Sequence, residues 1–330
     1  MESRRVLFVI IFMAVSISLV FAANVGVTIK EWPAASPKSF PHDPAVSSDG
    51  AFWYTGIMVN TLGRLDPRTG KIKEYHLTTP DSGPHGLAAD REGNIWFTAN
   101  YKGYIGRLNP ATGEVKEYPM PDRSARDPHS LVIDSNGIIW FTVQLGNFVG
   151  RLDPSTGNIM LKHSPTLNSH PYGIALNSRQ VLYFCEFGTN KIGSVNPDTM
   201  EITEYTLPDG TRPRRIVISP DDVIYYTDYA RGILGSLDPA SRKVKEWKSP
   251  GGPKSKPYSI TATRDGIIWY SESGVTPNTV VRFDPKTASF TKWTIPSGGG
   301  VVRNMVATKE GDIYLACSGQ NVLAIVHVIK

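Results

Sequence analysis

The sequence predicts an all-β protein, a seven-bladed β-propeller with four-stranded blades, in which the N-terminal strand closes the ring by completing the last blade. Three observations predict this fold. A unit of about 43 residues recurs along the chain. Each copy carries the signals of four short strands, and the two ends of the chain supply complementary parts of one incomplete copy.

The recurring unit is clearest in three consecutive copies, which start at Pro84, Pro128 and Pro171. They read PHGLAADREGNIWFTANYKGYIGRLNPATG, PHSLVIDSNGIIWFTVQLGNFVGRLDPSTG and PYGIALNSRQVLYFCEFGTNKIGSVNPDTM. We define the marker position as the second residue of each copy. The seven marker residues, spaced 43, 44, 43, 42, 44 and 45 residues apart, are His42, His85, His129, Tyr172, Arg214, Tyr258 and Arg303. Such even spacing is typical of a tandem structural repeat.

Each copy divides into four predicted strands. An apolar segment follows the marker, and a turn with acidic, Asn or Gly residues ends it. The third strand ends near a Gly-Arg pair and an Asp/Asn-Pro-x-Thr-Gly turn, and the fourth alternates charged and aromatic residues. This alternation and the Gly/Pro punctuation favour strands. The second strand carries an aromatic residue that we expect to pack between blades, at Trp53, Trp96, Trp140, Tyr183, Tyr225, Trp269 and Tyr314.

The ends of the chain predict how the ring closes. The last copy has strand signals at 314–316 and 322–328 and then stops, so it lacks a fourth strand. Residues 27–32, VTIKEW, have the pattern of that missing strand. Pairing the two segments would cover two sheet edges that are otherwise free.

Residues 1–22 have the pattern of a signal peptide, because Arg4 and Arg5 precede an apolar run over residues 6–21 and small residues follow. The run is short for a membrane span, although an uncleaved anchor is an alternative. We therefore expect a secreted or periplasmic protein whose single domain covers residues 23–330. It should have no membrane contact after signal cleavage.

The charge and the cysteine positions limit the kinds of binding partner and bond that are expected. The formal net charge is +5 over 330 residues without a run of basic residues, which does not indicate nucleic-acid binding. Cys185 and Cys317 lie three blades apart in the predicted register, too far for a disulfide. We expect both cysteines to be unpaired and the protein to act as a monomer on a small molecule in the central channel.

Two sets of equivalent positions are predicted to meet at the channel mouth. The first is the marker position, which opens the innermost strand. The second lies fourteen residues later, where the antiparallel second strand ends, and reads Gly56, Ala99, Val143, Glu186, Asp228, Glu272 and Cys317. Imidazoles thus occupy one half of the ring and carboxylates the other. Converging titratable groups are typical of active sites, although a hydrated channel can also use them as mutually satisfied polar lining.

The repeats, with their Pro-His-Gly, Gly-Asn-Ile-Trp-Phe-Thr, Ile-Gly-Arg-Leu and Glu-Tyr-Pro elements, resemble those of the streptogramin lyase (virginiamycin B lyase) family over essentially the whole predicted domain. The resemblance implies a magnesium-assisted lyase that opens the ester of a cyclic depsipeptide by elimination. Its functional residues are histidines at the marker position and glutamates at the channel face, including a His and a Glu fourteen residues apart. No copy of this chain has both.

Carried over by position, the resemblance gives two overlapping sets of candidates. Candidate catalytic residues are His129, His170, Glu186, Glu272 and Tyr258, with Asp127 beside His129. Candidate metal ligands are Glu186, Glu272, Asp228, His42 and His85. Magnesium would suit the carboxylates, whereas three equivalent histidines would suit zinc or another transition metal. Two alternatives to a lyase stay open. One is a lactonase or other metal-dependent hydrolase, and the other is a propeller without a metal that only binds a ligand or protein.

Overall fold

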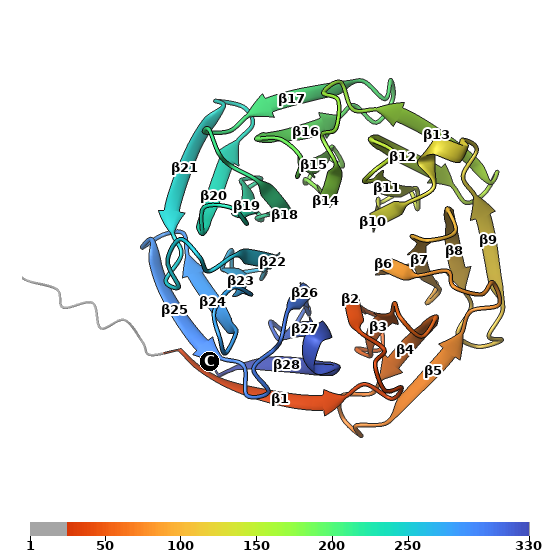
Figure 1. The fold of residues 1–330 in the computed structure, drawn as a ribbon, viewed down its shortest axis with the longest axis horizontal. Helices are drawn as coiled ribbons and strands as arrows, with labels where there is room; N and C mark the ends of the chain where they lie inside the picture. Colours follow the sequence, from red (N-terminus) through yellow and green to blue (C-terminus); the bar gives the residue numbers. More distant parts are fainter. Residues whose placement is uncertain (1–24, 330) are drawn as a thin grey trace, which may run out of the picture.

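The four strand signals of each repeat form one antiparallel sheet. The computed structural model describes residues 25–329, and in this range seven four-stranded sheets surround a central axis as blades (Figure 1). This confirms the predicted seven-bladed propeller. The predicted signal peptide lies outside the described residues. Within residues 25–329 no helix is long and apolar enough to cross a membrane.

Blades 1 to 4 follow the chain from the axis outward, so that each first strand is innermost and each fourth is outermost. The strands of blades 1 and 2 are β2 (Pro41–Val46), β3 (Phe52–Gly56), β4 (Thr61–Leu65), β5 (Ile72–His76), β6 (Pro84–Ala89), β7 (Ile95–Ala99), β8 (Tyr104–Leu108) and β9 (Val115–Pro119). A 3₁₀ turn, η1 (Arg123–Ala125), precedes blade 3. The strands of blades 3 and 4 are β10 (Pro128–Ile133), β11 (Ile139–Val143), β12 (Phe148–Asp153), β13 (Asn158–His163), β14 (Pro171–Leu176), β15 (Leu182–Glu186), β16 (Lys191–Val195) and β17 (Ile202–Thr206).

Blades 5 and 6 repeat this order, and blade 7 takes its outer strand from the other end of the chain. The strands of blades 5 and 6 are β18 (Pro213–Ile218), β19 (Ile224–Asp228), β20 (Ile233–Asp238), β21 (Lys243–Lys248), β22 (Pro257–Ala262), β23 (Ile268–Glu272), β24 (Thr279–Asp284) and β25 (Ser289–Thr294). Blade 7 contains β26 (Val302–Ala307), β27 (Ile313–Cys317), η2 (Ser318–Gln320), β28 (Val322–Ile329) and β1 (Gly26–Pro33).

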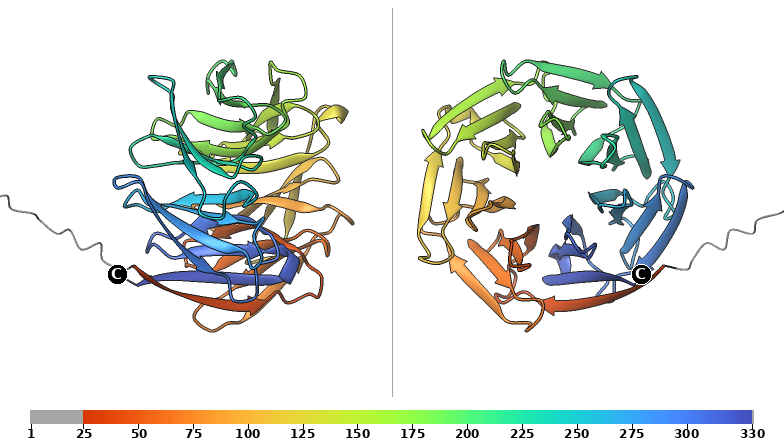
Figure 2. Two further views of the ribbon diagram at one scale, coloured as in Figure 1. Left: turned by 60° about the vertical axis from the view of Figure 1, so that its left-hand side comes forward. Right: turned by 180° about the vertical axis from the view of Figure 1, so that it is seen from behind.

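The ring closes as predicted. Strand β1 pairs antiparallel with β28 from Gly26↔Ile329 to Pro33↔Val322, and both views of Figure 2 show the two strands side by side. The outermost edge of blade 7 therefore comes from the first described strand of the chain. This pairing connects the two ends of the chain through backbone hydrogen bonds, which supports the closed ring.

The aromatic residues of the second strands pack between blades. Trp96 is 2% exposed and contacts the apolar residues of blade 3, including Ile139 and Phe141. Its indole N–H donates to Asp90 Oδ2 at 2.9 Å, and the Arg107 guanidinium lies over the ring. The interface between radial sheets therefore consists of aromatic side chains whose polar edges are satisfied.

A buried hydroxyl also links neighbouring inner strands. Thr98 Oγ1 accepts from the Gly86 backbone N–H within blade 2 and donates to the His129 carbonyl of blade 3, both at 2.7 Å. Equivalent bonds to the next blade come from Thr55, Thr142 and Thr227. Blades 4 and 7 carry Cys185 and Ala316 at this position, and both cysteines of the chain are buried and unpaired, as predicted.

Replacing Thr98 with valine keeps the shape of the side chain but removes this inter-blade link. We expect a loss of about 1–3 kcal/mol in the free energy of unfolding, because the Gly86 N–H stays buried without an acceptor. Denaturant unfolding measures the change. The matched Thr112→Val variant, in an exposed turn, should change stability much less, and equal losses in the two variants would contradict the role assigned to Thr98.

Candidate functional site

A β-bulge in the innermost strand of each blade turns the marker residue toward the axis. In blade 2, Pro84 pairs with Ala99 and Leu87 with Phe97, so His85 and Gly86 together lie opposite the single residue Thr98. The same register shift occurs in all seven inner strands. Such a bulge redirects side chains that regular alternation would point at a neighbouring sheet.

Marker residues of blades 1 to 4 form a continuous row of aromatic rings, the histidine stack, in which neighbouring rings are tilted by 45° to 48°. The ring centroids of His42 and His85 are 3.7 Å apart, those of His85 and His129 are 3.9 Å apart, and those of His129 and Tyr172 are 4.0 Å apart. All four side chains are buried. The even angular spacing of the blades therefore places the imidazoles in contact.

From Tyr172 onward, the marker residues form a group of arginine and tyrosine side chains. The hydroxyls of Tyr172 and Tyr258 are 2.7 Å apart, and Arg214 Nη2 donates to both, at 3.2 and 2.9 Å. The Arg214 guanidinium lies 3.7 Å from the centre of the Tyr258 ring. Burial would raise the pKa of Tyr258, but the nearby charges of Arg214, Arg215 and Arg303 lower it.

Beneath the marker residues, a salt bridge crosses the channel. Arg215 of blade 5 donates from Nη2 to Asp43 Oδ1 of blade 1 at 2.8 Å, and its Nη1 contacts Asp43 Oδ2 and Ser130 Oγ at 3.3 and 3.1 Å. Asn304 Nδ2 donates to Asp43 Oδ2 at 3.1 Å. Four blades thus share one polar network at the channel.

Sequence reasoning missed this network, because it considered the marker position and the position fourteen residues later but not the residue that directly follows the marker. The residues that follow the marker are Asp43, Gly86, Ser130, Gly173, Arg215, Ser259 and Asn304. Charged residues in a segment expected to be apolar were an available signal. The glycines have a packing role, because a Cβ on Gly86 would lie 2.5 Å from the His129 carbonyl oxygen.

The hydrogen-bond partners of the imidazoles indicate which ring nitrogen carries the proton. His42 Nδ1 lies 2.9 Å from Asp43 Oδ1 and His85 Nδ1 lies 3.1 Å from the His129 carbonyl oxygen. Carboxylate and carbonyl oxygens only accept, so both Nδ1 atoms carry the proton and both Nε2 atoms have a free lone pair. His129 Nδ1 instead contacts Ser130 Oγ, which can donate or accept.

All three imidazoles are neutral near pH 7. Burial lowers the pKa of His42 to about 4, although the bond to Asp43 opposes the shift. Burial lowers the pKa of His85 and of His129 well below its usual range. The positive charge of Arg215 adds to each shift. The mouth therefore presents uncharged imidazoles beside charged guanidinium groups.

The predicted carboxylates lie in the blades rather than in the channel. Glu186 bonds with Ser164 and Thr189, and burial raises its pKa to about 7. Glu272 accepts from Ser249, Thr279 and the Gly251 backbone. Asp228 pairs with Arg231 and accepts from the Arg212 backbone.

The expectation that the two positions fourteen residues apart converge is therefore not met at these three carboxylates. The reason is geometric. Side chains of a second strand project from the faces of a radial sheet toward neighbouring blades, whereas only the bulged first strand reaches the axis.

The remaining candidates occupy different places. Tyr258 lies in the arginine–tyrosine group at the channel, as expected for a marker residue. His170 is half-buried in the loop before β14 with a φ of 51°, next to Phe187 rather than the histidine stack. Asp127 accepts from the backbone of Leu145 and Gly146 and so stabilises a loop.

The donor atoms at the channel do not fit magnesium. Among residues 25–329, the only group of three potential ligands within 4.8 Å of one another is His42, Asp43 and His85. Asp43 provides the only carboxylate in this group of three. Arg215 and Asn304 already donate hydrogen bonds to that carboxylate. Magnesium prefers oxygen ligands, and any cation placed there would lie beside the Arg215 guanidinium.

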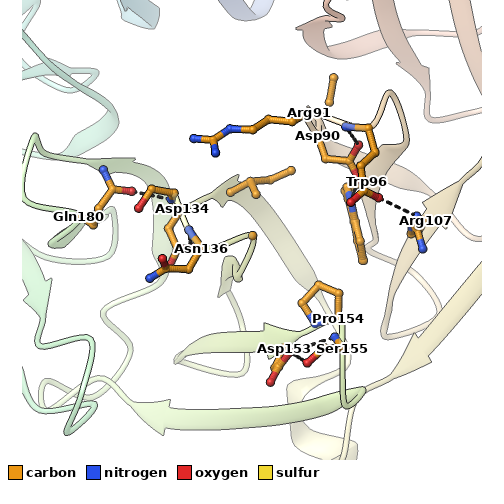
Figure 3. A pocket seen from close by; sticks show the side chains of 15 residues that line it. Asp90, Arg91, Trp96, Arg107, Asp134, Asn136, Asp153, Pro154, Ser155 and Gln180 are labelled. Atoms are coloured by element: carbon orange, nitrogen blue, oxygen red, sulfur yellow. Dashed lines mark hydrogen bonds and ion pairs between the residues drawn. The ribbon is translucent and has the colours of Figure 1, made fainter.

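Two cavities differ in whether their polar side chains are already bonded to other groups of the protein. The mouth cavity, about 370 Å³, is lined by the three marker histidines, Tyr172, Arg214 and Arg303, and by the loop residues Phe40, Met58 and Tyr101. A larger groove of about 740 Å³ lies on the opposite face, at the turns of blades 2 and 3 (Figure 3). There Asp90 and Asp134 bond indole and turn N–H groups, and Arg107 pairs with Glu92. The mouth is therefore the better candidate site.

Solved structures match this fold over most of the chain. A streptogramin B lyase is 27% identical, with a TM-score of 0.84 over 92% of this chain and 98% of that one. Selenomethionine-substituted virginiamycin B lyase from Staphylococcus aureus is 27% identical, with a TM-score of 0.83 over 92% of this chain and 100% of that one. A catalytically inactive variant of that enzyme with quinupristin is 26% identical with the same TM-score and coverage.

No curated protein sequence matches the chain significantly. The model of the virginiamycin B lyase family matches residues 12–186, more than half of the 330 residues. The similar solved structures cover the rest of the propeller as well. The repeats, the seven blades and these matches agree, and the chain belongs to the virginiamycin B lyase family.

Proposed function

We propose that the protein is a lyase that opens a carbon–oxygen bond of a small cyclic ester at the mouth of the channel, using its own side chains for proton transfer and charge stabilisation in place of a metal ion. One observation carries this proposal. Imidazoles with a free Nε2 lone pair and arginines with unpartnered N–H groups line the same mouth cavity.

His85 is the proposed base. Its Nδ1–H is fixed on the His129 carbonyl, so Nε2 is free to take a proton from the carbon next to a substrate carbonyl. The electron pair of that C–H bond forms a C=C bond, and the neighbouring C–O bond breaks. The ester leaves as a carboxylate, so the reaction consumes no water and the product has the mass of the substrate.

Arg214 and Arg303 are proposed to stabilise the negative charge that develops on the substrate carbonyl. The tyrosine rings hold Arg214 in place, so its guanidinium needs no reorganisation when charge appears. Negative charge on a bound substrate would also raise the pKa of the adjacent imidazoles and so make His85 a stronger base.

Replacing His85 with glutamine should reduce kcat by about 10²–10⁴-fold, because the side chain keeps its polarity but loses the basic nitrogen. A screen over cyclic esters and lactones, read by absorbance of the conjugated product, first identifies a substrate. A chelator should leave the rate of the wild type unchanged. The matched His76→Gln variant, on the outer strand β5, should keep full activity. Wild-type turnover that requires an added divalent ion would overturn the proposed chemistry.

A hydrolase such as a lactonase is the second candidate, and the His42–Asp43 contact favours it. A carboxylate on Nδ1 orients a histidine so that Nε2 can activate a water molecule. The mass of the product separates the two reactions, because hydrolysis adds one water and elimination adds none. Ligand binding without any turnover in the screen would leave the propeller as a binding protein.

We also propose that the protein is exported and acts as a monomer, on the grounds of the signal-like residues 1–22 and the self-closed ring. Fractionation of cells that express the full chain tests the first proposal. Light scattering of the purified protein tests the second.

A further inference from the structure

We propose that the mouth selects an organic anion, a small molecule with a carboxylate group at one end and an apolar body at the other. This inference names the substrate class of the same site, and it rests on the proposed function for the place where the ligand binds. Recognition of the free ligand does not require turnover.

Positive charge at this site is not neutralised by the protein. Arg214 and Arg303 line the mouth, and Arg212 and Lys256 line a neighbouring cavity of about 580 Å³. Across residues 25–329 none of these four side chains forms an ion pair, and no carboxylate lines either cavity. The nearby cation Arg231, by contrast, pairs with both Asp228 and Glu246.

Two of these arginines have unused hydrogen-bond donors. The Nε atoms of Arg214 and Arg303 are buried and have no acceptor within the described part of the chain. A buried N–H without an acceptor costs free energy, so such groups are expected to have a partner. A carboxylate in the mouth would supply acceptor oxygens to both side chains, and guanidinium groups match carboxylates in shape as well as in charge.

The Arg214 guanidinium is already held in position. It packs on the rings of Tyr172, Phe187, Tyr229 and Tyr258 at distances of 3.7 to 5.2 Å. Because the side chain is fixed before a ligand arrives, binding costs little conformational entropy. This arrangement favours binding of an anion over a purely structural role for the charge.

The part of the rim that blades 1 and 2 form is apolar. Phe40, Met58 and Tyr101 line the cavity from the loops of blades 1 and 2 and are 39%, 62% and 56% exposed. A ligand in the mouth would therefore place its charged end against Arg214 and Arg303 and its apolar end against the loops of blades 1 and 2. Phe187 lines both cavities, so a longer ligand can extend toward Arg212 and Lys256.

Calorimetric titration with 1-naphthoate and with the neutral 1-naphthamide tests this inference. We expect naphthoate to bind more tightly than the amide by at least about tenfold, and its affinity to fall with rising salt. Arg303→Gln should weaken naphthoate binding by about tenfold or more and leave amide binding unchanged. Arg107→Gln, on the opposite face, is the matched control.

Within residues 25–329 the Arg303 side chain makes no hydrogen bond, so its replacement should not prevent folding. Lys256→Gln provides a second, milder variant. Equal affinity for the two probes, or unchanged naphthoate binding in Arg303→Gln, would overturn the inference. Binding of naphthoate only when it is carried in anionic lipid vesicles would point to a membrane surface instead. His85→Gln should still bind naphthoate, so a failure of the lyase proposal is distinguishable from a failure of this one.

Discussion

Replacing Asp43 with asparagine should destabilise the propeller by about 3–5 kcal/mol, because it leaves the Arg215 guanidinium buried without a counter-charge. Both side chains are about 5% exposed or less, and the network joins blades 1, 3, 5 and 7. The Arg215 charge holds the pKa of Asp43 far below its usual range, although burial acts in the opposite direction. Thermal and denaturant unfolding measure the loss.

A matched control and a double variant separate charge from packing. Glu92→Gln removes one partner of the exposed Arg107–Glu92 pair and should change stability by about 1 kcal/mol or less. Replacing both partners, Asp43→Leu with Arg215→Met, should recover much of the stability, because no unpaired charge remains. A double variant as unstable as Asp43→Asn would show that the network acts mainly through shape.

The stability of the protein should fall steeply as the pH drops from about 6.5 to about 4. The pKa of His42 is about 4 in the folded state and near 6.5 in the unfolded chain, so between these values the unfolded state binds more protons. The contribution of His42 to stability is therefore full above pH 6.5 and is lost progressively as the pH falls, whereas the raised pKa of Glu186 opposes this loss above about pH 4.5. A difference of this size corresponds to about 3 kcal/mol for His42 alone.

His85 and His129 shift in the same direction, so the three imidazoles should act together, and each added proton also repels the others. In His129→Gln the slope of unfolding free energy against pH should decrease by about 1.4 kcal/mol per pH unit, the contribution of one proton. His76→Gln, on the exposed edge of blade 1, should leave the slope unchanged. A stability curve that stays flat between pH 6.5 and pH 4 would show that these imidazoles titrate as in the unfolded chain.

The site is asymmetric although the fold is a repeat. Every blade supplies the same bulge in its inner strand, and the seven marker residues differ in their chemistry. One side of the channel is imidazole and the other is arginine with tyrosine. Proton acceptors and cations thus line the same mouth, which is the arrangement that the proposed elimination needs.

Much of the fold could be predicted because each of its determinants is local. Each copy repeats the same local signals, which are glycine-containing turns, alternating strands and an aromatic residue equivalent to Trp96. Evenly spaced repeats with complementary ends leave few arrangements other than a closed ring. The position of the marker residues at the channel followed from the same register. That part of the site was therefore accessible to sequence reasoning.

The sequence by itself determined the number of blades, the closure between β1 and β28 and the ring of marker residues. Only the tertiary structure decided which side chains meet at the axis, because a one-residue bulge brings Asp43 and Arg215 to the channel from opposite sides, 172 positions apart in the chain. The same geometry directs Glu186 and Glu272 into the blades. Local patterns specify strands and their order. The direction in which a side chain points depends on the bulge, and contacts across the ring depend on all seven blades together.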